Sequence, residues 1–366
     1  MEVNVSLAVI CWEGMDHLEH CLPAMEEAAR GCDVTDRILV DGASADGSAA
    51  WVSEHCPTWR VIDLGANLGA AGARNRALEE AASDWVFLAD CDAVPPPGAA
   101  ASLLETAGRF PGAAVVSPTS VFFDDTDRVH YDGGQIHYAG LFSLRRFYES
   151  GTPAAAAHPG HQAHTDGGFV SVAALYDCST VLGVGGFCEE MFILFEDLDL
   201  SFRLRALGFD VVRDPAVRVL HRHGSVGISH RGAGRYPNRR IFLHSRNRWL
   251  FLLRSLRIRT LLLTLPAQLL YEVIWAGFAV RSGAPWAYLS GKMDVFRHLG
   301  SVVRARRALQ RSRRGAPPGR ADRDLLVGGP LTFAPHVATP GGRRVISRFL
   351  DAAMKGWWRL VGGACG

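Results

Sequence analysis

Short apolar runs alternate with segments of helical periodicity along the first 90 residues. The apolar runs are VSLAVICW, RILVDGAS, WRVIDLG and WVFLAD, and each fits a buried strand. Between the first two runs, Leu18, Leu22 and Met25 recur at helical spacing, and the segments AAWVSEHC and AAGARNRALEEAAS also suit helices. This alternation predicts an α/β fold with a mostly parallel central sheet and helices on both of its faces.

Polar residues collect where the predicted strands end, which is the edge where sheets of this kind hold ligands. The second strand ends at Asp41 in DGASADGS, the third is followed by ANLGAAGARN, and the fourth ends with Asp90 and Asp92 in ADCD. These residue types also satisfy ordinary turns. Their occurrence at three successive strand ends favours a binding site. The run Pro95–Pro97 cannot donate ladder hydrogen bonds and should stop the strand.

The pair Asp90 and Asp92 points to a cation. Two carboxylates one residue apart repel each other at the tip of a buried strand unless a positive charge lies between them. Mg²⁺ and Mn²⁺ prefer oxygen ligands and commonly combine one or two carboxylates with the phosphates of a substrate. The segment therefore predicts a Mg²⁺ or Mn²⁺ site that also receives a phosphate group.

A second acidic group, Glu196, Asp197 and Asp199, opens the helix-like run FEDLDLSFRLRALGF. Acids are stabilised at a helix N-terminus, so simple capping is one interpretation. The other is a general base, which must lie within hydrogen-bond reach of the proton that it removes. Farther along, VVRDPAVRVLHRHG fits two short strands with His221 and His223 on one face. Either histidine is structural or a metal ligand, and His221 is the stronger candidate.

Taken together, these motifs resemble the family 2 glycosyltransferases, which are inverting, nucleotide-sugar-dependent enzymes of the GT-A fold. The resemblance covers about residues 3–230 and rests on VSLAVICWEG, DGASADGS, NLGAAGARN, ADCD and FEDLDLSFRLRALGF in that order. It implies that Asp41 contacts the nucleotide base or ribose, with Arg74 as a weaker nucleotide candidate. Asp92 would bind the metal most directly, Asp90 would serve the ribose or a metal-bound water, and His221 would complete the coordination.

The resemblance also implies the catalytic residues. Asp197 would be the general base that activates an acceptor hydroxyl, with Glu196 beside it as the second choice, and displacement of the nucleoside diphosphate would invert the anomeric carbon. Three residues depart from the family pattern: Cys11 and Glu13 after the first strand, and Cys188 before the acidic motif. The segment VFFDDTDRVHYDGGQIHYAG fits an acceptor-side variable region, with its acids on the solvated surface.

Charge divides the chain into two halves. The 366 residues are 48% hydrophobic and 21% charged, as in ordinary folded proteins. Residues 1–235 hold 16 basic and 32 acidic side chains, a formal charge of −16, whereas residues 236–366 hold 23 and 5, or +18. We therefore expect a catalytic domain at 1–235, basic amphipathic helices that associate with membranes at 236–314, and a linker and tail at 315–366.

Cysteine spacing and the first residues bear on the cellular compartment. The eight cysteines form no CxxC pair and show no zinc-type spacing with histidine, so we expect free thiols. The opening MEVNVSLAVICW lacks the positive charge of a signal peptide. These features predict a cytoplasmic protein, peripheral on the inner face of the cell membrane.

The basic half predicts contact with an anionic membrane surface. Leu261–Val280 is apolar but contains Pro266, Gln268 and Glu272, which makes it marginal as a spanning helix. Seven arginines precede it and favour helices that lie on the membrane: Arg239, Arg240, Arg246, Arg248, Arg254, Arg257 and Arg259. A helical cap on the catalytic domain is the alternative. The run RHLGSVVRARRALQRSRRG could instead contact nucleic acid, but it lacks recognition motifs, and we expect no nucleic-acid partner.

The segment SRNRW separates two kinds of family 2 enzyme. Arg248 and Trp249 match the Q-x-x-R-W motif of polysaccharide synthases, but Ser245 replaces the glutamine and no multiple spans follow. We therefore expect transfer of one or a few sugars from a nucleotide-sugar donor to a lipid-linked or cell-surface glycan acceptor. The alternative is a non-catalytic nucleotide- or sugar-binding scaffold of the same fold.

Overall fold

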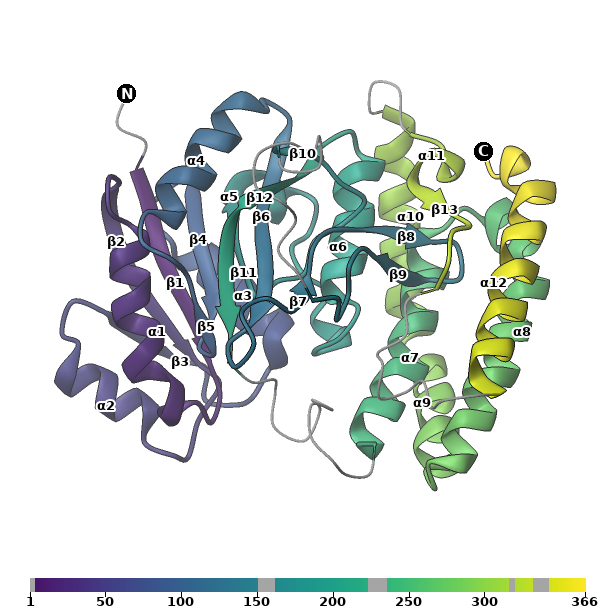
Figure 1. Ribbon diagram of the computed structural model, residues 1–366, viewed down its shortest axis with the longest axis horizontal. Coiled ribbons are helices and arrows are strands. Elements are labelled where there is room, and N and C mark those ends of the chain that lie inside the picture. Colours follow the sequence, from purple (N-terminus) through teal and green to yellow (C-terminus); the bar gives the residue numbers. More distant parts are fainter. Residues whose placement is uncertain (1–3, 151–161, 223–235, 316–319, 332–341) are drawn as a thin grey trace.

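The computed structural model describes residues 4–150, 162–222, 236–315, 320–331 and 342–366 (Figure 1). The strands are β1 (Asn4–Cys11), β2 (Asp33–Asp41), β3 (Arg60–Asp63), β4 (Trp85–Asp90), β5 (Ala93–Val94), β6 (Ala113–Phe122), β7 (Val129–Tyr131), β8 (Gly134–His137), β9 (Leu141–Leu144), β10 (His164–Thr165), β11 (Ala173–Asp177), β12 (Asp210–His221) and β13 (Leu326–Val327). The α-helices are α1 (Met15–Ala28), α2 (Ser48–His55), α3 (Gly69–Glu80), α4 (Ala99–Arg109), α5 (Cys178–Gly183), α6 (Glu196–Ala206), α7 (Asn238–Ser255), α8 (Ile258–Arg281), α9 (Pro285–Arg297), α10 (Leu299–Gly315), α11 (Asp322–Leu325) and α12 (Gly342–Val361).

The central sheet has the order β10-β12-β6-β11-β4-β1-β2-β3, with β5 paired to β12 and β7 paired to β6. The predicted strands β1 to β4 form, and all of their pairings are parallel. Strand β11 lies antiparallel between β4 and β6. The sheet is therefore mixed: most pairings along this order are parallel, as predicted, but β11 is antiparallel to both of its neighbours. The reason is that the chain between β6 and β11 makes hairpins instead of a crossover helix, which a parallel neighbour would require.

Strand β12 corrects a second expectation. The segment that fits two short strands forms one strand, Asp210–His221, which pairs in parallel with β6. The register shifts between Asp214 and Arg218, around Pro215, which has no N–H to donate to the ladder. This irregularity explains why the sequence looks interrupted. The strand delivers His221 to the edge where β4 ends.

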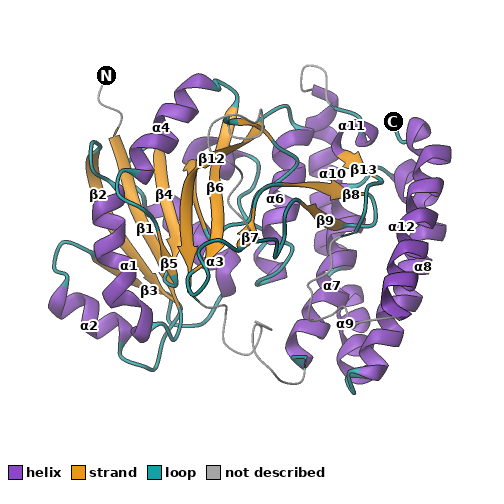
Figure 2. Ribbon diagram, viewed as in Figure 1, coloured by secondary structure: helices purple, strands orange, loops and turns teal. Residues whose placement is uncertain are grey.

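The strands of the sheet are buried because helices cover both faces (Figure 2). In β1, Leu7 and Val9 join the core on one face, whereas Ala8 and Ile10 join the core on the other. This alternation follows from the two-residue period of a strand. It also explains why the apolar runs are continuous, as expected for parallel strands buried on both sides.

Helix α6 links the sheet to the C-terminal helices. Leu200 and Leu204 pack toward the sheet. Leu198 and Phe202 belong to a separate core with Phe251 and other residues of α7 to α12. The basic half is thus packed onto the acidic half through the helix that carries Glu196 and Asp197.

The C-terminal tail also belongs to this packing. Residues 315–330 have linker composition, yet β13 within them pairs with β8, and the ring of Trp358 in α12 stacks on Tyr138 with centroids 4.9 Å apart. All eight cysteines are free, as predicted. In the part of the chain that the structure describes, one helix, Ile258–Arg281, is long and apolar enough to cross a membrane, and 33% of its most apolar window is buried.

Candidate active site

Arg74 joins two of the acidic motifs at the carboxyl edge of the sheet. It lies on α3, is 3% exposed, and forms ion pairs with Asp90 at 2.6 Å and with Glu196 at 3.0 Å. The same guanidinium donates to the carbonyl oxygen of Ser171 at 3.1 Å. Asp90 ends β4 and Glu196 begins α6, so residues 74, 90 and 196 meet although they are far apart in the sequence. Sequence reasoning made Arg74 only a weak nucleotide candidate.

The carboxyl groups around Arg74 hold their protons unusually tightly. Burial and the neighbouring Asp197 raise the pKa of Glu196 to about 8, against the opposing effect of Arg74. Burial raises the pKa of Asp197 to about 6, although Arg74 and the Leu198 N–H lower it. Burial also raises the pKa of Asp90, partly offset by Arg74. One cation thus serves three carboxyl groups, of which Glu196 is buried and Asp90 and Asp197 are partly buried. Asp197 has the lower pKa of the two acids of α6, which makes it the better candidate for a base near neutral pH.

Asp92 meets His221 on the neighbouring strand. The turn after β4 leads into β5, which pairs with β12, and this pairing brings Asp92 Oδ2 within 3.1 Å of His221 Nε2. The other ring nitrogen of His221, Nδ1, lies 3.1 Å from Nδ1 of His130. Sequence reasoning missed His130, because its segment between β6 and β8 carries no spacing signal that relates it to His221.

A divalent metal fits this edge. Two ligands of one ion commonly lie about 3 Å apart, which is close to the separation of Asp92 Oδ2 and His221 Nε2. Within the described ranges, no group of three or more His, Cys, Asp or Glu side chains could hold a metal ion. Asp92 and His221 are therefore candidate ligands only, and the diphosphate of a donor and water would have to supply the remaining oxygens. His223, the second histidine candidate, lies outside the described residues.

Asp41 is held in a tight turn at the end of β2. Its carboxylate is buried and accepts hydrogen bonds from the N–H and the hydroxyl of Ser44 at 2.8 and 2.7 Å. Glu13, one of the departures from the family pattern, accepts a bond from the N–H of Ala45 at 2.8 Å. The loops after β1 and β2 are thereby tied together. A cavity of about 320 Å³, lined in part by Asp63 and Arg76, contains none of the candidate site residues.

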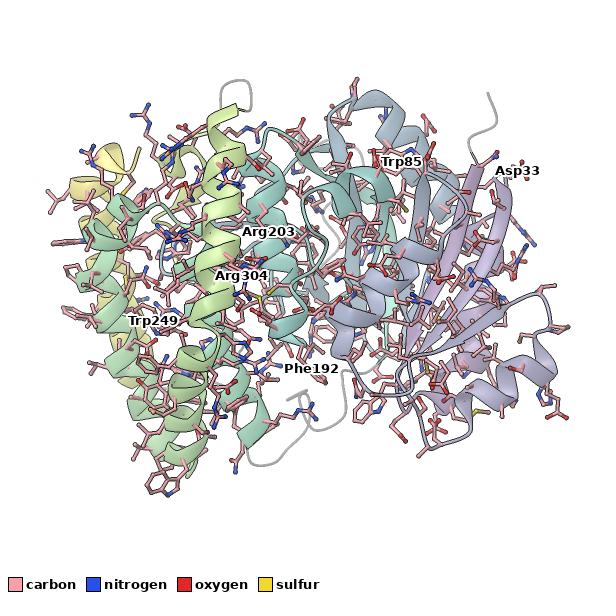
Figure 3. The ribbon with its side chains drawn as sticks, turned by 180° about the vertical axis from the view of Figure 1, so that it is seen from behind. Asp33, Trp85, Phe192, Arg203, Trp249 and Arg304 are labelled. Atoms are coloured by element: carbon pink, nitrogen blue, oxygen red, sulfur yellow. The ribbon has the colours of Figure 1, made fainter. Side chains whose placement is uncertain are left out.

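The loop before α6 has a strained backbone. Phe192, Leu194 and Phe195 have φ values of 66°, 70° and 74°, in the left-handed region that non-glycine residues rarely occupy. The side-chain N–H₂ of Asn247 on α7 donates to the carbonyl oxygens of Met191, Ile193 and Leu194 at 2.8, 3.0 and 2.7 Å. The loop lies where the sheet and the C-terminal helices meet, as the position of Phe192 shows (Figure 3).

This loop also reaches the donor side of the site. The carbonyl oxygen of Phe192 accepts a bond from the N–H of Ala71 on α3 at 3.0 Å. A Cβ on Gly69 would lie 2.4 Å from the same oxygen, so this close approach requires glycine there. Asn247 therefore holds the segment that leads directly into Glu196 and Asp197. Sequence reasoning quoted Asn247 within SRNRW but gave it no role.

Asp199, the third acid of the same motif, is structural. It is fully buried, pairs with Arg203 at 2.8 Å and with Arg254 at 3.5 Å, and accepts the hydroxyl of Ser255 at 3.0 Å. Burial alone would raise the pKa of Asp199, but the two arginines lower it. Of the acids at the start of α6, Asp197 and Glu196 remain the catalytic candidates.

Several arginines of the basic half do not face solvent. Arg248 is 1% exposed and donates to the Ala139 carbonyl at 2.7 Å and to Glu272 at 2.5 Å, so it supports interhelical packing and does not contact the site. Arg246 pairs with Asp294 at 3.2 Å. The expectation that the seven arginines from Arg239 to Arg259 favour helices lying on a membrane therefore fails for Arg246, Arg248 and Arg254, because the C-terminal core uses their charges internally.

One acid of the 121–140 segment also departs from expectation. Asp132 is 7% exposed and accepts hydrogen bonds from Thr119, at 3.0 Å, and from Arg213. It is therefore not part of the solvated surface. An isolated buried arginine would be costly, and Asp132 compensates the charge of Arg213 between β6 and β12.

Comparison with known proteins agrees with this fold. Residues 16–163 match the model of the family described as "Glycosyl transferase family 2". The chain is 29% identical over 259 residues to N-acetylglucosaminyl-diphospho-decaprenol L-rhamnosyltransferase of Mycobacterium tuberculosis, covering 64% of this chain and 80% of the relative. It is 31% identical over 191 residues to pre-mycofactocin glycosyltransferase of the same organism, covering 51% of this chain and 37% of that relative.

Among solved structures, GalNAc-T7 with UDP, GalNAc and Mn²⁺ aligns with a TM-score of 0.54 and 12% identity, over 82% of this chain and 57% of that chain. At that identity the likeness concerns the fold alone. It confirms the predicted GT-A architecture for the α/β part of the chain.

Proposed function

We propose that this chain, which belongs to glycosyltransferase family 2, moves a hexose or deoxyhexose from a nucleotide-diphosphate donor to a hydroxyl of a lipid-linked or cell-surface glycan. The observation that carries the proposal is the half-buried Asp197, whose pKa is raised to about 6, next to Glu196 and Arg74 at the carboxyl edge of the sheet. A binding module has no need of a carboxylate poised near neutrality, whereas a transferase needs one.

The chain's own residues supply the chemical step. Asp197 takes the proton from the acceptor hydroxyl as its oxygen attacks the anomeric carbon of the donor sugar. The bond from that carbon to the diphosphate breaks, and the electron pair leaves with the nucleoside diphosphate. Attack from the face opposite the leaving group inverts the anomeric configuration. Positioning of two reactants is a large rate term, so no covalent enzyme nucleophile is required.

Asp92 and His221 are the residues that would hold Mg²⁺ or Mn²⁺, with Asp90 nearby for the ribose or a metal-bound water. The bound ion would neutralise the charge of the departing diphosphate. If Nε2 of His221 is a ligand, its Nδ1 carries the proton and donates to Nδ1 of His130, which fixes the ring. Asp41 at the end of β2 is the candidate contact to the nucleoside.

The relatives narrow the substrates within this proposal. The M. tuberculosis relative that is 29% identical to this chain is named as a transferase of L-rhamnose to a decaprenyl-diphosphate-linked N-acetylglucosamine. By analogy, the acceptor here is a sugar on a lipid diphosphate and the donor sugar is a deoxyhexose such as rhamnose. An acceptor of that kind resides in a membrane, so the enzyme would work on the cytoplasmic side, peripheral on the inner face of the cell membrane and in contact with its anionic surface.

The test is release of nucleoside diphosphate from a panel of UDP, dTDP and GDP sugars, with Mn²⁺, with Mg²⁺ and with a chelator. A prior thermal-shift series with the free nucleoside diphosphates and Mn²⁺ identifies the nucleobase of the donor, because a ligand that binds only the folded state raises Tm. We expect metal-dependent turnover that Asp92→Ala abolishes. The matched control is Asp33→Ala, since Asp33 is an exposed acid at the opposite end of β2.

Two outcomes would contradict the assignment. Full activity of Asp92→Ala would show that the metal seat is elsewhere. Nucleotide binding without turnover of any donor, in the presence of lipid-linked acceptors, would instead favour the non-catalytic scaffold.

A further inference from the structure

One buried stripe runs through two consecutive helices, α9 and α10. Gly291, Val295, Val302 and Leu309 are buried and lie four, seven and seven residues apart, which keeps them on one side of a helix. This side faces α7. A Cβ on Gly291 would lie 2.6 Å from the carbonyl oxygen of Phe242, so the two backbones are in close contact. Because the buried side keeps the same helical phase in α9 and α10, their outward sides also share one phase.

The outward side of α9 is apolar. Trp286, Leu289, Met293 and Phe296 recur at intervals of three and four residues, and Trp286 is 79% and Phe296 64% exposed. Exposed apolar residues that are scattered singly need no explanation, but a row of four along one helix marks an interaction site.

The outward side of α10 is cationic. Arg304, Arg307, Arg311 and Arg314 are all exposed, again three or four residues apart. None of the four forms an ion pair with any residue in the described parts of the chain, and no acidic residue occurs between 295 and 321. In contrast, Arg313 on the inward side pairs with Asp322 at 2.8 Å. The outward arginines are thus positive charges without an internal use.

We propose that this outward face of α9 and α10 is the surface by which the protein docks on an anionic lipid bilayer. The apolar row of α9 enters the region between headgroups and acyl chains, and the arginine row of α10 contacts the anionic headgroups. The face lies in the region 236–314 that is expected to associate with membranes, but it does not use the arginines before α8, since Arg246, Arg248 and Arg254 are engaged inside the molecule. The inference rests on the proposed function only in that a lipid-linked acceptor requires a membrane.

The position of α9 suits this role. The N-terminus lies at the upper end of β1 in Figure 1, so β1, β2 and β4 point their carboxyl ends toward the lower end, where α9 is also found. The apolar row of α9 and the candidate active site thus lie toward the same end of the molecule. A second copy of the chain fits the face less well, because two arginine rows would repel each other across a symmetric contact. Nucleic acid would use the arginines but leave the apolar row of α9 unexplained.

The experiment is sedimentation of the full-length protein with vesicles of phosphatidylcholine alone and of phosphatidylcholine with 30% phosphatidylglycerol. Two variants address the two rows: Trp286→Ser with Phe296→Ser, and Arg304→Gln with Arg307→Gln and Arg311→Gln. The matched control is Leu262→Ser with Val273→Ser, because the outward side of α8 carries a second row of exposed apolar residues and is the competing face. Thermal unfolding of each variant verifies that it is folded.

We expect the wild-type protein and the α8 control to bind the anionic vesicles. The arginine variant should bind them about 100-fold more weakly at low salt, at about 1 kcal/mol for each arginine. The α9 variant should bind the anionic vesicles at least about tenfold more weakly. Loss of binding in the α8 control with normal binding of the α9 variant would move the docking face to α8 and overturn the inference. So would salt-sensitive binding to RNA without binding to vesicles.

Activity separates this inference from the proposed reaction. All of these variants should release nucleoside diphosphate at the wild-type rate with a short-chain, water-soluble acceptor, because the substituted residues lie outside the site. Vesicle binding without turnover would contradict the proposed reaction alone, and turnover without vesicle binding would contradict the docking face alone.

Discussion

Two buried arginines, Arg74 at the sheet edge and Arg248 among the C-terminal helices, both lower the pKa of their acidic partners, but only at Arg248 is the effect of burial outweighed. Burial alone would raise the pKa of Glu272, but Arg248 and Lys292 lower it below its usual value. Arg74 must serve Asp90 and Glu196 at once, and the pKa of each remains raised. The helical region thus balances its buried charge, whereas the sheet edge leaves a deficit of positive charge.

The same contrast occurs within one turn of α6. Asp199 is matched by two arginines and a serine hydroxyl, and its pKa is lowered. Asp197, two residues earlier, accepts a bond from the Leu198 N–H at 2.8 Å, and its pKa stays raised to about 6 although Arg74 and backbone N–H groups lower it. Structural charges are compensated by the protein itself, while a site that awaits a substrate, a metal or a proton is not. This difference separates catalytic from structural acids that look alike in the motif.

The largest expected effect comes from exchanging the two aspartates of α6. Asp197→Asn should lower kcat by about 10³-fold or more, because general-base catalysis contributes up to about 10⁴-fold. It should leave Tm and nucleotide affinity nearly unchanged. Asp199→Asn should do the reverse, since it leaves Arg203 and Arg254 with less compensating charge. Steady-state kinetics and thermal unfolding of both variants measure this, and a stable, inactive Asp199→Asn would reverse the two roles.

The next effect concerns the two arginines. Arg248→Met should cost about 3–5 kcal/mol in the free energy of unfolding, the usual result of removing one partner of a buried ion pair. Arg74→Met should cost less, because Glu196 and Asp90 already have raised pKa values and can be protonated instead. Urea unfolding measures both, with the exposed Arg281→Met as the control. Equal losses for both arginines would remove the contrast between the two regions.

A smaller effect should follow from loosening the loop that precedes α6. Asn247→Leu removes the donor to three carbonyl oxygens and should lower kcat about 10- to 100-fold through misplacement of Asp197. The KM for the donor should change little. Asn238→Leu, at an exposed position of the same helix, is the matched control. A loss confined to stability, with unchanged kcat in the folded fraction, would limit Asn247 to packing.

The smallest effect is on stability as a function of pH. A buried acid with a raised pKa binds more protons in the folded than in the unfolded state, so its contribution to stability decreases as pH rises from its unfolded value toward about 8. Glu196→Gln should therefore lose less stability than the wild type between pH 5 and pH 8. Thermal unfolding across that range measures the difference, and parallel curves would show that Glu196 titrates normally.

The sequence was sufficient to predict the local parts of this fold. The apolar runs of β1 to β4 and the helical spacing of Leu18, Leu22 and Met25 predicted the first half of the sheet correctly. Asp90 and Asp92 lie at the edge that the pattern indicated. These features depend on residue periodicity and on strand ends, both of which are visible within short windows.

The rest depends on contacts between residues distant in the chain. The meeting of His130 with His221 spans 91 positions, and that of Tyr138 with Trp358 in α12 spans 220. No local pattern reports such pairs, so His130 and the structured tail were missed. The role of Asn247 was missed for the same reason, because its partners lie in a loop 53 to 56 residues away.

The most direct test of Asp197 as the ionised base beside a protonated Glu196 is the pH dependence of kcat. We predict that the wild-type rate falls as pH decreases through about 6, the pKa of Asp197, because protonation removes the base. In Glu196→Gln, kcat should still fall as pH decreases through about 6, and most of the activity at pH 7 should remain. Asp197→Asn should have little activity at pH 7 and no such fall. If kcat of Glu196→Gln no longer fell at acidic pH and Asp197→Asn were active, the assignment would be contradicted and Glu196 would be the base.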